Sequence, residues 1–201
     1  MGQVVVVENV TLDGVMQAPG GAHEDARGGF PYGGWAHPYA DPVMAEVMSK
    51  GMHGDGALLF GRRTYQQFHG FWSAQTGNPF AEVLNAKTKY VASRTLAEPL
   101  PWQHSSLLRG DAVETVTELQ GRVDGDLVVL GSGELVRTLA AAHLVDMYVL
   151  SIYPLTLGTG GKLFATGPGG YGTLELVEAV PTTTGVIVAT YRTVAREDVV
   201  A

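Results

Sequence analysis

The chain has 201 residues, of which 45% are hydrophobic, and it contains no cysteine. A length and an apolar share of this order suit one globular domain over residues 1–201, and the lack of cysteine excludes a disulfide framework and a thiolate metal site. A formal net charge of −7 argues against nucleic acid or an anionic membrane as the main partner. We therefore expect a cytoplasmic protein that acts on a small molecule. The six histidines show no ligand spacing such as H-E-x-x-H, so we expect no metal.

An apolar run from Val4 to Val10 predicts the first strand, in the interior of a sheet. Residues 11–16 follow at its carboxyl end. The segment from Gln17 to Ala40 is rich in Gly and Pro and carries four aromatic residues, Phe30, Tyr32, Trp35 and Tyr39. A loop of this length inside a compact domain is usually a lid or a binding loop. We expect its aromatics to close over a flat ligand, because a floppy surface excursion would expose them.

Asp41 and Pro42 predict the start of a helix, with an N-cap followed by a proline at the first helical position. A carboxylate at this place also suits a catalytic role, in which Asp41 donates or relays a proton. The capping role explains Asp41 equally well and is the interpretation that we favour.

A short strand over Ala57–Phe60 is followed by Gly61-Arg62-Arg63-Thr64 at the start of a helix. Arginines in the first turn work against the helix dipole, and an anionic ligand would compensate for them. Solvated surface arginines remain the alternative. Residues 70–87 are expected to be mostly loop, with a short helix that begins at Asn78-Pro79.

A further strand over Thr88–Ala92 ends at Ser93 and Arg94, which adds a hydroxyl and a guanidinium to the same edge of the sheet. Ser105–Leu108 is expected to be an edge strand. Asp111 predicts the N-cap of a helix that extends to Val123, with apolar residues at helical spacing on its inner face.

The segment Asp126–Ala142 predicts a buried strand over Leu127–Leu130, a turn at Gly131-Ser132-Gly133, and a helix that begins with Glu134 and Leu135. Such a junction aims backbone N–H groups and the positive end of a helix at one point, which favours an anion such as a phosphate. An ordinary turn between a strand and a helix explains the glycines equally well. The stretch is not the dinucleotide fingerprint G-x-G-x-x-G, because residue 136 is Val.

Another strand is expected over residues 144–153, and Tyr171–Val180 with Gly185–Val194 predicts a C-terminal hairpin. Alternating strands and helices indicate an α/β fold, with a mostly parallel central sheet, helices on both faces and an antiparallel hairpin at the end. In such sheets ligands bind outside the carboxyl ends of the strands. The candidate segments 11–16, 61–64, 93–95 and 131–134 all fall at those ends and together outline one cleft.

Five short motifs occur in an order that resembles the dihydrofolate reductase superfamily: Thr11-Leu-Asp-Gly14, Leu59-Phe-Gly-Arg-Arg-Thr-Tyr65, Tyr90-Val-Ala-Ser93, Leu130-Gly-Ser-Gly-Glu134 and Pro154-Leu-Thr-Leu-Gly-Thr-Gly160. The chain is most similar to the branch that includes the C-terminal reductase domain of bacterial riboflavin biosynthesis. The resemblance covers nearly the whole chain and implies a dihydrofolate reductase-like fold.

The resemblance also implies NADPH as cofactor and assigns residues to its parts. The pyrophosphate and adenosine end would lie against Gly61, Arg62, Arg63 and Thr64, and the 2′-phosphate against Ser93 and Arg94. The pyrophosphate and nicotinamide ribose would lie over Gly131, Ser132, Gly133, Glu134 and Leu135. The nicotinamide would be bordered by Asn9, Val15 and Met16, and the substrate would be approached by Trp35, Tyr153, Leu157 and Gly158.

The chain departs from true dihydrofolate reductases on the substrate side. Their acidic residue follows a loop Trp by five positions, whereas here Trp35 is followed at that offset by Ala40, and Asp41 is one further. Lys87 stands roughly where an arginine would grip a folate tail, and this change is not conservative at a bidentate site. Folate is therefore not the expected substrate.

These observations predict an NADPH-dependent reductase that transfers a hydride to a small heterocyclic or carbonyl substrate, pyrimidine- or pterin-like. The alternative is a nucleotide-binding protein of the same fold without hydride-transfer activity. The resemblance further implies a homodimer.

Overall fold

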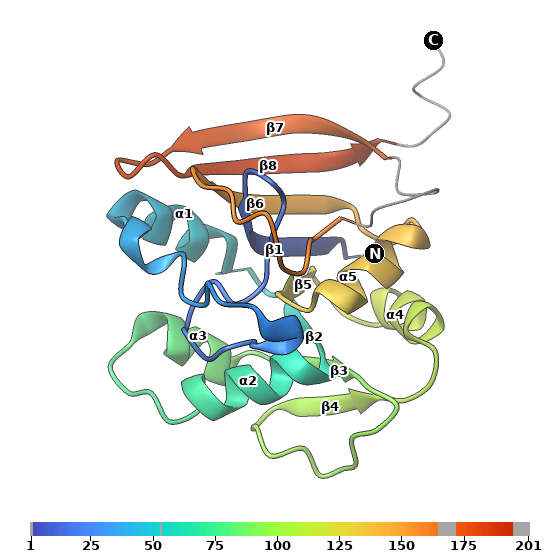
Figure 1. Cartoon of the computed structure of the whole chain (residues 1–201). Helices are drawn as coiled ribbons and strands as arrows, with labels where there is room; N and C mark the ends of the chain where they lie inside the picture. The colour runs from blue at the N-terminus through green and yellow to red at the C-terminus, as the bar shows by residue number, and fades with distance from the viewer. Residues whose placement is uncertain (1, 53, 165–171, 195–201) are drawn as a thin grey trace.

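The computed structural model describes residues 2–52, 54–164 and 172–194. One eight-stranded sheet has the order β4-β3-β2-β5-β1-β6-β8-β7 (Figure 1). Its strands are β1 (Val4–Thr11), β2 (Ala57–Gly61), β3 (Lys89–Ala92), β4 (Ser105–Leu108), β5 (Leu127–Leu130), β6 (Met147–Tyr153), β7 (Thr173–Pro181) and β8 (Ile187–Val194). The helices are α1 (Pro42–Met52), α2 (Arg62–Trp72), α3 (Pro79–Ala86), α4 (Ala112–Gln120) and α5 (Gly133–Ala141).

Strands β1 to β6 pair in parallel, whereas β8 is antiparallel to both β6 and β7. The prediction of a mostly parallel sheet that ends in an antiparallel hairpin is thus confirmed. Tyr171, with which the hairpin was expected to begin, lies outside the described residues. Within the part of the chain that the structure describes, no helix has the length and apolar character needed to cross a bilayer.

Alternation along the central strands places helices on both faces of the sheet. Leu127 and Val129 of β5 belong to a core cluster with α4 and α5, whereas Val128 and Leu130 belong to a second cluster with Tyr65 of α2 and with α3. Because both faces of β5 are covered, all four of its residues are buried. This explains why the strand is a continuous apolar run.

Helical structure extends further into residues 70–87 than the sequence predicted. Helix α2 continues through Gly70 to Trp72, and α3 has eight residues. The Trp72 ring meets Phe80 at 5.0 Å and Phe68 at 6.5 Å, so aromatic packing between α2 and α3 outweighs the helix-weakening effect of the glycine.

The segment from Gln17 to Ala40 is anchored to the rest of the molecule and runs in front of α2 (Figure 1). Trp35 Nε1 donates to the Gln17 carbonyl at 2.7 Å, and both Trp35 and Phe30 are buried. Two 3-10 turns, Arg27–Gly29 and His37–Tyr39, give the segment local structure. A floppy surface excursion is therefore excluded.

Candidate active site

Two strand-to-helix junctions meet at the carboxyl ends of the adjacent strands β2 and β5. The Gly61 backbone N–H donates to Ser132 Oγ at 2.9 Å, and the Ser132 backbone N–H donates to Thr64 Oγ1 at 3.0 Å. These reciprocal hydrogen bonds hold the first turns of α2 and α5 next to each other. Two segments 71 residues apart in the sequence thus form one surface.

The N-termini of α2 and α5 differ from those of the other helices near the sheet. Helix α3 is capped by the Asn78 side chain and α4 by Asp111, but neither α2 nor α5 has a side-chain cap. The first N–H groups of a helix have no intrahelical partner, and the dipole makes this end positive. Two such ends beside each other form a site for an anionic group.

Two glycines shape the turn into α5, Gly131 through its positive φ and Gly133 through the close packing of Met16 on it. Gly131 has φ 58°, and a Cβ there would approach Thr64 Cγ2 to 3.0 Å. A Cβ at Gly133 would lie 2.5 Å from Met16 Sδ. Ser132 also has a positive φ, 63°, which its hydrogen bonds to Gly61 and Thr64 maintain. The turn therefore brings bare backbone to the surface of the cleft.

A cleft with a volume of ≈ 390 Å³ lies over these two helix ends. The predicted residues that line it are Gly61, Arg62, Arg63, Thr64, Ser93, Arg94, Ser132, Gly133, Glu134 and Leu135. Gly131 is absent from this lining and serves the turn beneath it. Thr95, the last residue of the candidate segment 93–95, lines the cleft too. The lining also includes residues that the sequence had not assigned to the site, namely Arg27, Ala92, Gly110, Asp111, Ala112 and Thr138. The cleft thus unites three of the four segments that were expected to form it.

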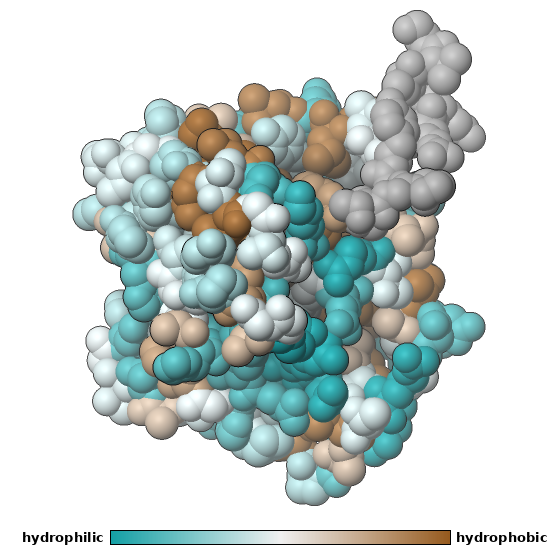
Figure 2. All heavy atoms as spheres, viewed as in Figure 1, coloured by the Kyte–Doolittle hydropathy of each residue, from teal (hydrophilic) through white to brown (hydrophobic). Residues whose placement is uncertain are grey.

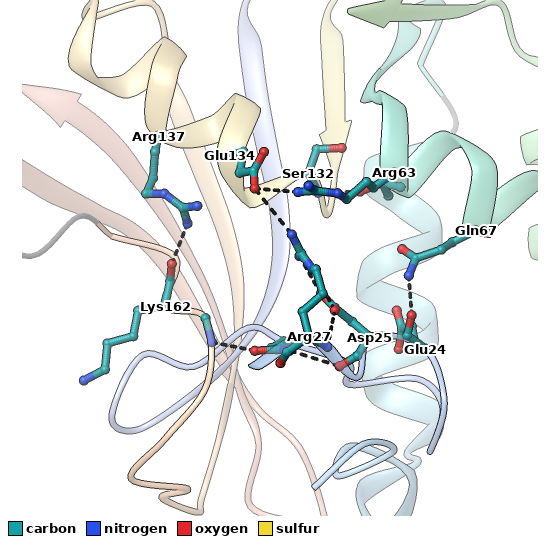
Figure 3. Close-up of polar contacts among 12 residues, drawn as sticks. Glu24, Asp25, Arg27, Arg63, Gln67, Ser132, Glu134, Arg137 and Lys162 are labelled. Carbon is teal, nitrogen blue, oxygen red and sulfur yellow. Dashed lines mark hydrogen bonds and ion pairs between the residues drawn. The ribbon is translucent and has the colours of Figure 1, made fainter. Parts of the chain in front are cut away.

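A charged network closes one side of the cleft (Figure 3). Glu134 Oε1 accepts from Arg63 Nη1 at 2.6 Å and from Arg27 Nη1 at 3.4 Å. The hydrogen bond from Arg63 is the main reason why the pKa of Glu134 is lowered. Arg27 in turn pairs with Asp25 at 2.5 Å. The network connects the 17–40 segment to both α2 and α5, so the segment borders the anion site directly.

The surface of the molecule is hydrophilic around the cleft. Figure 2 shows hydrophilic residues gathered between α2 and α5, where the 17–40 segment crosses the cleft. Arg27 could not be assigned to the site from the sequence, because nothing in the loop's composition says which of its residues reaches α5.

The residues expected at the nicotinamide end, Asn9, Val15 and Met16, do not line this cleft. Val15 is buried, and its N–H donates to Thr11 Oγ1 at 3.0 Å. Met16 packs over Gly133, and its N–H donates to the Gly161 carbonyl at 2.9 Å. Asn9 Oδ1 accepts from the Tyr153 hydroxyl at 3.1 Å. The segment 11–16, which follows β1, is therefore in direct contact with the turn into α5.

The residues expected at the substrate side come together in an aromatic cluster. The Tyr153 ring meets Trp35 edge-on at 5.0 Å and Tyr39 at 5.6 Å. Trp35 and Tyr153 are buried, and Leu157 packs against them. The N–H groups of Leu157 and Gly158 donate to the Asp13 carboxylate at 3.2 and 2.8 Å, so Asp13 holds this turn in place. A direct contact of Leu157 or Gly158 with a substrate stays a prediction.

The Asp41 carboxylate is engaged as an N-cap. It accepts from the Val43 N–H at 2.7 Å, and on the other side from the N–H and the hydroxyl of Thr183 in the β7–β8 turn. The hydrogen bond from the Thr183 hydroxyl is the main cause of a lowered pKa for Asp41. A carboxylate held ionised in this way has no proton to give at neutral pH. The geometry thus favours the capping role over the catalytic one.

The model of the RibD C-terminal domain matches residues 3–188, which is most of the chain. The chain belongs to the RibD C-terminal domain family. This is a family of NAD(P)H-dependent reductases. An uncharacterized protein of Bacillus subtilis (strain 168), YyaP, is 30% identical over 112 residues, which span 53% of this chain and 58% of that protein.

Solved structures with the same fold cover almost the whole chain. A putative riboflavin biosynthesis protein from Shewanella sp. PV-4 has a TM-score of 0.69 at 20% identity and covers 96% of this chain and 99% of its own. Dihydrofolate reductase from Enterococcus faecalis, in complex with NADP(H) and RAB-propyl, has a TM-score of 0.63 at 15% identity, covering 96% and 98%. A pyrimidine reductase-like protein from Corynebacterium diphtheriae has a TM-score of 0.64 at 12% identity, covering 96% and 92%. These likenesses confirm the dihydrofolate reductase-like fold.

Glu8 is a polar residue of this RibD C-terminal domain that the sequence analysis missed. Its side chain is 5% exposed, and burial raises its pKa from 4.5 to about 8, although the Asn9 backbone opposes the shift. The negative charge of Glu24 adds to the increase. Glu8 Oε2 has no hydrogen-bond partner among the described residues. The signal in the sequence was one acidic residue that interrupts the apolar run of β1.

Replacement of Glu8 by Gln should change how stability depends on pH. Between pH 4.5 and about pH 8, the folded wild type keeps a Glu8 proton that the unfolded chain has already released. The free energy of unfolding of the wild type therefore falls as the pH rises through that window. The slope expected for one group is about 1.4 kcal/mol per pH unit. Glu8→Gln carries no such proton and should therefore gain stability over the wild type as pH rises.

Urea unfolding at about pH 5 and about pH 8 measures this difference, since the other titrating groups cancel between the two proteins. Glu118→Gln, on the exposed surface of α4, is the matched control and should follow the wild type at both values. If the free energy of unfolding changes equally between the two pH values in wild type and in Glu8→Gln, Glu8 is ionised at both values.

Proposed function

We propose that the protein is an NADPH-dependent reductase that transfers a hydride to a small heterocyclic or carbonyl substrate, pyrimidine- or pterin-like. One observation carries the proposal. Two helix N-termini without side-chain caps, at the ends of adjacent parallel strands, share a cleft with the guanidinium groups of Arg62, Arg63 and Arg94. A dinucleotide with a pyrophosphate and a 2′-phosphate needs an anion site of this kind.

The backbone of both junctions fits a pyrophosphate. Residues in the first turns of α2 and α5 line the cleft, and neither helix has a side-chain cap on its first N–H groups. The residues that would hold the group are Gly61–Thr64 on one side and Gly133–Leu135 on the other.

The 2′-phosphate is best matched by Arg62 and Arg94 with the Ser93 hydroxyl, because guanidinium groups bind phosphate with two hydrogen bonds each. Two carboxylates also line the cleft, and both have other partners. Asp111 accepts from the Val113 N–H at 2.8 Å as a cap, and Glu134 pairs with Arg63 at 2.6 Å. Neither is free to receive the 2′-hydroxyl of NAD, and this supports a preference for NADPH.

NADPH, when bound, supplies a hydride with its electron pair to an electrophilic C=N or C=O carbon, while the nitrogen or oxygen takes up a proton. The aromatic cluster of Trp35, Tyr39 and Tyr153 would position a flat substrate on the side of the sheet opposite α5. The 17–40 segment would exclude water from the cofactor and from the substrate. Asp41 is already ionised, so the proton is proposed to come from water.

The alternative is a protein of the same fold that binds the nucleotide without hydride transfer. It is favoured by one observation on the substrate side. Trp35 and Tyr153 are 7% and 2% exposed, so side chains rather than open space occupy the place expected for the substrate.

Binding and turnover together test the proposed function. NADPH should bind, and its absorbance as the reduced cofactor should fall in the presence of at least one member of a panel of pterins, aminopyrimidine ribosides and quinoid carbonyls. Tight binding without turnover on any of them supports the nucleotide-binding alternative. If neither NADPH nor NADH binds, both functions fail.

The arginines of the cleft should set the choice of cofactor. A charge-assisted hydrogen bond contributes about 1.5–3 kcal/mol, so loss of one contact to the 2′-phosphate should weaken NADPH about ten- to a hundredfold. Titration of both cofactors on Arg62→Ala, Arg63→Ala and Arg94→Ala measures this effect, with the exposed Arg122→Ala, just after α4, as the matched control. At least one cleft variant should lose NADPH affinity and keep its NADH affinity. Equal wild-type affinities for the two cofactors would contradict the assignment.

We further propose that the protein forms a homodimer through the outer hairpin. Strand β7 ends the sheet, and Leu176 and Val177 are exposed on it next to a register shift in its pairing with β8. Figure 2 shows apolar residues along this edge of the molecule. Sedimentation should give twice the 21.3 kDa mass of one chain. The Val177→Lys variant should shift the measured mass toward that of a single chain. A monomer at micromolar concentration would exclude the dimer.

A further inference from the structure

Glu8 lies at the point where two central strands separate. Strand β1 is in register with β5 from Val4 to Val7, which is paired with Leu130. After this pair β5 ends, and the chain turns through Gly131 into α5. Glu8 is the first residue of β1 beyond the separation, while on its other side it remains paired with Leu150 of β6.

The alternation of β1 shows which face Glu8 is on. Val6 and Val10, two residues before and after it, belong to the core cluster that contains Leu135 of α5. Glu8 therefore faces the α5 side of the sheet, next to the end of β5. Asn9 faces the other side, where it bonds to Tyr153 of the aromatic cluster. Glu8 and Asn9 thus face opposite sides of the sheet, Glu8 the side of α5 and Asn9 the side of the aromatic cluster.

The Glu8 carboxyl has unused hydrogen-bonding capacity. It is 5% exposed, and its Oε2 has no partner among the residues that the structure describes. With its pKa raised to about 8 by burial, the group is a neutral acid at neutral pH, with one O–H donor and one carbonyl acceptor. A buried polar group without a partner is costly, so each such group in a native protein calls for a partner that satisfies it.

We propose that Glu8 binds the carboxamide of the nicotinamide ring, donating its O–H to the amide oxygen and accepting from the amide NH₂. A carboxylic acid and a primary amide are complementary in this way, because each offers one donor and one acceptor side by side. The inference rests on the proposed function, since it assigns a residue to the nicotinamide half of the same cofactor. It gives that half a polar recognition group, whereas the arginines recognise the phosphates.

Three ligands separate this contact from the rest of the cofactor. NADP⁺ has the complete carboxamide, its 3-acetylpyridine analogue replaces the NH₂ by a methyl group, and 2′-phospho-ADP-ribose lacks the ring. Calorimetric titration of each on wild type, Glu8→Gln and Glu8→Leu measures affinity without requiring turnover. The Gln side chain retains one donor and one acceptor, and Leu retains neither. Far-UV circular dichroism checks that both variants are folded, and Glu118→Gln is the matched control.

The expected result is that Glu8→Leu weakens NADP⁺ about tenfold, as loss of one or two neutral hydrogen bonds predicts, and leaves 2′-phospho-ADP-ribose unchanged. Glu8→Gln should stay close to wild type. The wild type should prefer NADP⁺ over the acetylpyridine analogue, and Glu8→Leu should lose that preference. Unchanged NADP⁺ affinity in Glu8→Leu, or an equal loss for 2′-phospho-ADP-ribose, would overturn the contact. If the wild type binds none of the three ligands, the proposed function itself is wrong.

Discussion

The reciprocal hydrogen bonds between the two strand-to-helix junctions are the constraint on which the site depends. Gly61 donates to the Ser132 hydroxyl, and Ser132 donates to the Thr64 hydroxyl. Each junction thus uses the other's polar groups to satisfy its own backbone, instead of a side-chain cap within its helix. The N–H groups of both first turns are left for a ligand. A pair of separately capped helices on the same strands would have the same fold and no anion site.

The charges of the cleft show how an acidic protein can still present a locally favourable site for an anion. The chain carries a net charge of −7, yet three arginines surround the two helix ends, and the nearby carboxylates are already paired or used as caps. Favourable local potential therefore does not require a basic protein. The phosphates would meet fixed dipoles and guanidinium groups at short range, where the overall charge has little influence because salt screens it.

The sequence predicted the fold and most of the residues that line the cleft, for a physical reason. Strand β5 is buried on both faces and so is continuously apolar, and Gly131-Ser132-Gly133 and Gly61-Arg62 mark turns that need special backbone or an anion. Such signals are local. The contribution of Arg27 depends on how a long loop folds back over α5, and the extent of α2 past Gly70 depends on packing against Phe80. Neither can be found from spacing along the chain.

The substrate half was less accessible to sequence reasoning. From the sequence, Asp41 could be either a helix cap or an acid, and only its partner in the β7–β8 turn decides between them. Glu8 stands out only in the structure, where it is a buried carboxyl with an unpartnered oxygen among the described residues. In both cases the residue type was visible but its environment was not. The chemistry of a carboxyl group depends on which groups surround it, and these come from distant parts of the chain.

The turn between β7 and β8 has a consequence for how the molecule holds together. Thr183 binds Asp41 at the start of α1, and the Thr184 hydroxyl donates to the Tyr39 carbonyl at 3.1 Å. The β7–β8 hairpin therefore holds the end of the 17–40 segment in place through these hydrogen bonds. It thereby also holds Tyr39, a member of the aromatic cluster. During synthesis these hydrogen bonds can form only after the turn that follows β7 has emerged, more than 140 residues after Tyr39 and Asp41.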